Sequence, residues 1–195
     1  MKLRALLLIM FTGLRCMAQD ADLTLLNEQR IATNKTGMMI LGGWGAANVV
    51  SGIAGYAIAD QQNRKAFHGM NALWGAVNGF IAIGGYMGAV KESNIAYEYD
   101  DALKRYKSNK KLYLINAGLD VVYIGTGVVL TGIADNTNNP EIFHGFGQSV
   151  IIQGAALLLF DSIMYGLHQS RNGKWAQLAG GISFTGNGIG YVYRF

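Results

Sequence analysis

The chain has 195 residues, of which 51% are hydrophobic and 14% charged, with 27 glycines, one proline and a formal net charge of +4. This composition excludes an intrinsically disordered chain, and the length suits one domain. The basic residues form no stripe interleaved with aromatic side chains, so nucleic acid is not an expected partner.

The chain begins with the features of a secretory signal peptide, which we place at residues 1–18. A basic start is followed by the apolar residues 5–14 and by Ala18, a small residue before a polar one. Ten apolar residues span about 15 Å of helix, too short to cross a bilayer. Processing as a lipoprotein at Cys16 is the alternative, against which the preceding Arg15 argues. Cleavage after Ala18 leaves no cysteine, and therefore no thiol chemistry or disulfide.

Four apolar stretches follow the signal peptide. Residues 36–59 and 67–90 carry no charge, while residues 112–134 and 142–167 carry one aspartate each. About 20 apolar residues suffice to cross a membrane, and none of the four alternates with the period of a β-strand. The competing interpretation is a soluble bundle, which has difficulty burying such runs on all sides. We therefore predict four transmembrane helices.

The predicted fold class is all-α. It is a four-helix transmembrane bundle made of two repeated helical hairpins, with an interfacial amphipathic linker helix and an amphipathic C-terminal tail. The tail ends in an alternation of Ile189, Tyr191 and Tyr193 that resembles the last strand of an outer-membrane barrel, but the chain lacks the other strands. The predicted segments are a polar amphipathic start at 19–35, hairpin 1 at 36–90, the linker at 91–111, hairpin 2 at 112–168 and the tail at 169–195.

Two internal repeats support the division into hairpins. Trp-Gly-Ala-x-Asn occurs at 44–48 and again, 30 residues later, at 74–78. Ile-Ala-Asp at 58–60 and Phe-His-Gly at 67–69 return at 133–135 and 143–145. An even number of spans separates the copies of the second repeat, which predicts a parallel repeat of whole hairpins.

These motifs, with the signal ending Met17-Ala18-Gln19, resemble an uncharacterised family of small multi-pass membrane proteins from Bacteroidota-type bacteria, which has no known function. We expect the chain in a membrane of the bacterial cell envelope, the inner membrane, with the outer membrane as the alternative. Most basic residues fall on the side of the 91–111 linker, which the positive-inside rule places in the cytoplasm. A cleaved signal peptide places the same side outside, so the absolute orientation stays open.

Several polar residues lie inside the predicted spans. Asn48, Asn78 and Gln153 fall at similar depths and are expected to form one buried polar layer, either as interhelical hydrogen bonds or as part of a solute path. Asp120 and Asp161 are expected near the same end of hairpin 2, where two carboxylates can share a proton or hold a cation.

Two further sets of residues have local explanations. The repeated pairs Asp60/His68 and Asp135/His144 offer a divalent-metal site only if the hairpins bring them together, and their spacing matches no established metal motif. We therefore expect no metal and no cofactor. Small residues four apart predict close helix packing; they are Ser51, Gly55, Gly75, Gly79, Gly84 and Gly88.

No nucleophile elbow, phosphate loop or metalloprotease motif occurs, and we identify no catalytic residue. The sequence favours a non-enzymatic membrane protein that acts by packing or partner contact, with the lipid bilayer, itself or another membrane protein as partners. A small-solute or ion pathway through the intramembrane Asn, Gln and Asp residues is the alternative. A metal-dependent membrane enzyme is the third possibility.

Overall fold

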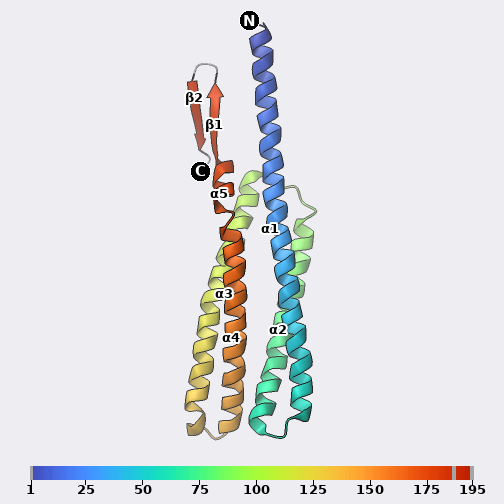
Figure 1. The fold of residues 1–195 in the computed structure, drawn as a ribbon, viewed down its shortest axis with the longest axis vertical. Helices are drawn as coiled ribbons and strands as arrows, with labels where there is room; N and C mark the ends of the chain where they lie inside the picture. The colour runs from blue at the N-terminus through green and yellow to red at the C-terminus, as the bar shows by residue number, and fades with distance from the viewer. Residues whose placement is uncertain (1, 186–187, 194–195) are drawn as a thin grey trace.

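The computed structural model describes the backbone of residues 2–185 and 188–193 and the side chains of residues 21–178. Four long helices make up most of it (Figure 1). They are α1 (Lys2–Ile58), α2 (Gln62–Glu92), α3 (Tyr99–Ile133) and α4 (Pro140–Gln169). The remaining elements are the 3-10 turn η1 (Ala134–Asn136), the short helix α5 (Asn172–Ala179) and the strands β1 (Gly180–Thr185) and β2 (Gly188–Tyr193).

The long helices form two antiparallel hairpins, α1 with α2 and α3 with α4, and the hairpins meet mainly where α2 packs against α4. Each hairpin has a pair of glycines in mutual contact. A Cβ atom added to Gly45 would lie 2.7 Å from the carbonyl oxygen of Gly75, and one added to Gly75 would lie 2.6 Å from that of Gly45. Gly127 and Gly147 make the same reciprocal contact, at 2.7 and 2.6 Å. Only glycine allows the backbones to approach this closely.

Of the small residues expected to pack against a neighbouring helix, some do so in the structure and others do not. Gly75 lies in the reciprocal contact, the backbone of Gly79 lies beside Gly45, and Gly55 lies under the ring of His68. Gly84 and Gly88 face open space instead, and Ser51 is exposed, with its hydroxyl donating to the carbonyl of Ala47. Spacing alone identifies residues on one side of a helix but not the side that has a neighbour.

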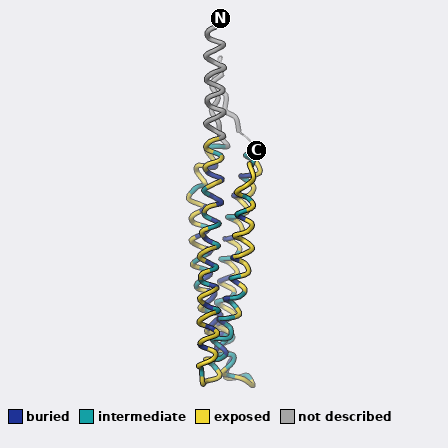
Figure 2. The backbone as a smooth tube through the Cα atoms, turned by 90° about the vertical axis from the view of Figure 1, so that its right-hand side faces the viewer, coloured by how far each residue is buried: buried dark blue, intermediate teal, exposed yellow. Residues whose placement is uncertain are grey.

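Large apolar side chains cover much of the outside of the helices, while several polar side chains are buried between them. Within the spans, Asn48, Asn78 and Gln153 are buried, whereas Phe80 is 76% exposed and Ile83 is 60% exposed. Figure 2 shows exposed residues along the outside of the helices for most of their length. Four helices, Ala21–Ile58, Gln62–Glu92, Tyr99–Asn136 and Pro140–Leu178, are long and apolar enough to cross a membrane. Large apolar side chains on the outside, together with polar groups kept inside, suit hydrocarbon surroundings.

At the polar end, segments 21–35, 91–111 and 168–178 pack together, and we call this end the head. Arg30 is fully buried there, and its guanidinium lies 2.7 Å from the Glu92 carboxylate and donates to the side chains of Asn27 and Asn109. The rings of Tyr106 and Trp175 stack with centroids 4.9 Å apart. The head therefore has its own core of mixed polar and aromatic contacts.

The structure differs from the sequence expectation in three segments. The polar start at 19–35 is continuous with the first span in α1, and residues 99–111 are the first turns of α3 instead of a separate interfacial helix. The tail forms α5 and the antiparallel hairpin β1–β2, so the chain is not entirely helical. The alternating residues Ile189 to Tyr193 belong to strand β2. Within the predicted signal peptide, residue 1 and the side chains lie outside the described residues.

Candidate functional site

A cluster of buried polar side chains lies where α1, α2 and α4 meet, and we call it the amide cluster. Gln153, with no exposed surface, is at its centre. Its Nε2 donates to Asn48 Oδ1 at 2.6 Å and to Asn71 Oδ1 at 2.9 Å, while its Oε1 accepts from Trp44 Nε1 at 3.0 Å. Ser149 Oγ donates to Asn71 Oδ1 at 2.7 Å. These bonds satisfy polar groups that burial removes from water.

The amide cluster contains two of the three residues expected to form a polar layer. Asn48 and Gln153 bond directly, but Asn78 is buried elsewhere on α2, and its Nδ2 has no hydrogen-bond partner. Asn78 lies seven residues, about 10 Å of helix, beyond Asn71. Depth counted from the turns was therefore too coarse. The sequence does not identify Asn71 and Ser149 as members of the cluster, because a single Asn or Ser within an apolar stretch is a weak indication of a buried polar site.

A second polar site, the carboxyl pair, lies between α3 and α4. Asp120 and Asp161 are 3% and 5% exposed, and their carboxyl groups lie close enough to interact directly. The Asn116 side chain lies beside Asp161, whereas Asp120 Oδ2 is buried and has no hydrogen-bond partner among the described residues. The structure thus places next to one another the two aspartates that the sequence analysis singled out.

A separate group of polar side chains lies nearer the head, about two helical turns from the carboxyl pair. The hydroxyl of Tyr113 donates to Asn34 Oδ1 at 3.3 Å, and His168 Nε2 lies 2.9 Å from the same oxygen. The Tyr113 ring stacks on His168 with centroids 5.6 Å apart, and Tyr106 donates its hydroxyl proton to the His168 carbonyl. Because Asn34 Oδ1 accepts, the imidazole tautomer with hydrogen on Nε2 fits, which leaves Nδ1 as a buried acceptor without a partner. We call Tyr113, Asn34 and His168 the relay residues.

The relay residues were missed in the sequence although a signal existed. His168 follows Asp161 by seven residues and Tyr113 precedes Asp120 by seven, so each lies two turns from its aspartate on the same helix face. This seven-residue spacing in α3 and α4 is the signal by which Tyr113 and His168 can be identified from the sequence.

The repeated Asp and His residues do not form a common site. His144 Nε2 lies 3.2 Å from Asp135 Oδ1 within the second hairpin. His68 packs against Gly55 and edge-on to the Phe67 ring, while Asp60 is exposed. Among the described residues, no three His, Cys, Asp or Glu side chains gather to hold a metal ion. The metal-dependent alternative therefore gains no support from the described side chains.

Comparison with known proteins gives one family. A family model described as a family of unknown function, DUF6992, matches residues 40–162, which include the amide cluster and the carboxyl pair. No curated protein and no solved structure matches the chain. The match spans well over half of the sequence. The chain therefore belongs to the DUF6992 family of unknown function.

Proposed function

We propose that the chain is a non-enzymatic, four-span protein of the bacterial cell envelope, placed in the inner membrane, whose working part is the carboxyl pair. In this proposal Asp120 and Asp161 bind and release a proton or a small monovalent cation. The observation that carries the proposal is the close approach of two buried carboxyl groups inside long apolar helices. Ionisable groups at such depth are costly to bury, and function is the first explanation to test.

The surroundings of the pair support exchange with one side of the membrane. Tyr113, Asn34 and His168 provide hydroxyl, amide and imidazole groups between the pair and the head. Hydroxyl and imidazole groups of this kind pass protons in membrane proteins. The unpartnered Asp120 Oδ2 is a free acceptor for the transferred ion.

The proposal predicts the behaviour of conservative variants in reconstituted vesicles. Asp161→Asn preserves the shape of the side chain but removes its exchangeable carboxyl proton, so we expect proton or sodium uptake to fall at least about tenfold. The thermal stability of this variant should equal that of the wild type or be slightly higher, because the uncharged amide avoids the cost of burying a charged carboxylate. The measurement is dye-reported flux under an imposed potential, alongside thermal unfolding of each variant.

Asp60→Asn is the matched control, because Asp60 is an exposed carboxylate in the turn between α1 and α2. It should transport like the wild type. If the Asp120→Asn and Asp161→Asn variants transport ions as fast as the wild type, the proposal is contradicted.

A partner-contact role is the second candidate, and one feature of α3 favours it. Gly118, Gly125 and Gly132 are exposed at seven-residue intervals, and a Cβ atom added to any of them meets nothing within 4 Å. Glycines at this spacing line one side of a helix and permit close approach of another membrane helix. A wild-type protein without flux that is isolated as an oligomer or complex would favour this role.

A further inference from the structure

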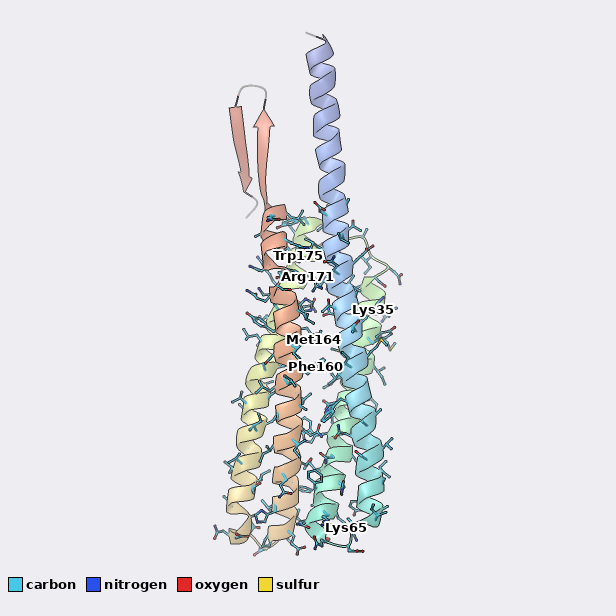
Figure 3. All side chains as sticks on the ribbon, viewed as in Figure 1. Lys35, Lys65, Phe160, Met164, Arg171 and Trp175 are labelled. Carbon is cyan, nitrogen blue, oxygen red and sulfur yellow. The ribbon has the colours of Figure 1, made fainter. Side chains whose placement is uncertain are left out.

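A groove of about 590 Å³ runs between α1 and α4 in the half of the bundle nearest the head. Its walls are mostly apolar and include Ile40, Leu41, Leu157, Phe160 and Met164. Trp44 and Ala156 lie at the deep end, and Gln29, Thr33 and Arg171 at the head end. In Figure 3, Phe160, Met164 and Arg171 lie one above another beside the space between α4 and α1. Its volume lies in the range of binding sites for small molecules.

The length of the groove corresponds to one leaflet of a bilayer and its headgroup layer. From Gln29 to Trp44 there are fifteen residues of α1, or about 22 Å of helix. Half of the hydrocarbon core is about 15 Å thick, so the groove extends beyond it at the head end. Its outer walls are open to the surroundings of the bundle, since Ile40 is 60% and Leu159 64% exposed.

The charge in the groove lies at one end only. Arg171 is the single charged residue among those that line it, and no acidic residue lines it. The Arg171 guanidinium donates to the carbonyl of Leu167 at 3.0 Å and, among the described side chains, has no carboxylate partner. It therefore retains donors for an anion at the depth where the apolar part of α4 ends.

We propose that this groove binds one anionic phospholipid, with an acyl chain along α1 and α4 and the phosphate on Arg171. The apolar walls of the groove match the acyl chain of a phospholipid, and the unpaired guanidinium at its end matches the phosphate. A water-soluble anion would leave the apolar walls uncovered, and a hydrocarbon alone would leave Arg171 without a counter-ion. Bidentate bonding of guanidinium to phosphate gives the preference for an anionic headgroup.

The test uses the full-length protein in nanodiscs of phosphatidylglycerol and phosphatidylcholine, followed by native mass spectrometry of the lipid that stays bound. The wild type should retain one phosphatidylglycerol about fivefold more often than phosphatidylcholine at equal supply. Arg171→Gln should remove this preference without removing lipid. Ala156→Trp should fill the deep end and reduce retention of both lipids, with Ala156→Leu as a smaller substitute if the first variant unfolds.

Lys174→Gln is the matched control, because Lys174 is an exposed basic residue of the head that does not line the groove. It should behave like the wild type. Equal loss of preference in Lys174→Gln and Arg171→Gln would overturn the proposal in favour of a diffuse surface charge effect. Equal binding of glycerol phosphate, which has no acyl chain, would overturn it in favour of a simple anion site.

Discussion

Replacing Gly75 by leucine is expected to separate the two helices of the first hairpin. A Cβ atom at this position would lie 2.6 Å from the Gly45 carbonyl oxygen and 2.7 Å from the Val49 backbone nitrogen. Both obstacles are backbone atoms, so no rotation of a side chain relieves the clash, and α1 and α2 must move apart. Overpacking of this kind lowers the free energy of unfolding by about 3 kcal/mol. Denaturant titration of the purified protein in detergent micelles measures the change.

Gly84→Leu, at a position on the same helix, provides the control for the glycine substitution. A Cβ atom there meets nothing within 4 Å, so the helix should accept the larger side chain with little change in stability. The two substitutions alter helix propensity and hydrophobicity equally. Equal destabilisation by both would show that the close approach of Gly45 and Gly75 does not hold the hairpin together.

Replacing Arg30 by alanine should produce a loss of similar or greater size in the head. Arg30 has no exposed surface and bonds to Glu92, Asn27 and Asn109, so truncation leaves the buried side-chain oxygen of Asn27 and the partly buried one of Asn109 without their donor. Glu92 keeps Arg105 as a partner, so the loss comes from the missing hydrogen bonds of a charged group, each of which contributes about 1.5 to 3 kcal/mol. The measurement is again the unfolding free energy, at low and at high salt.

Arg105→Ala supplies the comparison, since Arg105 bonds to the other oxygen of the same Glu92 carboxylate at 2.6 Å. Its side chain is 44% exposed, and exposed ion pairs contribute about 0 to 1 kcal/mol, less at high salt. A larger effect for Arg105→Ala than for Arg30→Ala would refute the assignment of Arg30 as the centre of the head.

The sequence predicted the four long helices because the length of an apolar stretch reports a long helix directly. Four long apolar helices are present where four apolar stretches were read. The repeat of Trp-Gly-Ala-x-Asn at 30 residues corresponds to a structural contact, since its second residues, Gly45 and Gly75, are the two glycines that touch. An antiparallel hairpin turning near Asp60 brings these positions to the same level.

The finer organisation depends on which face of each helix meets a neighbour, and the sequence reports this poorly. The carboxyl pair was predictable because intramembrane aspartates are rare. The relay residues are ordinary polar or aromatic residues near the head, where many such side chains occur. The first turns of α3 mix charged and aromatic residues, as an interfacial helix does. They continue the axis of α3 instead, because Ala102 and Tyr106 are buried against α1 and α5.

The central claim is that the exposed apolar surface of the bundle lies in lipid, and cysteine labelling in intact membranes tests it most directly. Single cysteines at Ile83, Ser108 and Asn138, all exposed in the structure, are introduced in a Cys16→Ser background. An impermeant maleimide should label Ser108→Cys and Asn138→Cys from opposite sides of the membrane. Ile83→Cys should stay unlabelled from both sides until the protein is denatured. Rapid labelling of Ile83→Cys in intact membranes, or of the other two from one side, would contradict the account.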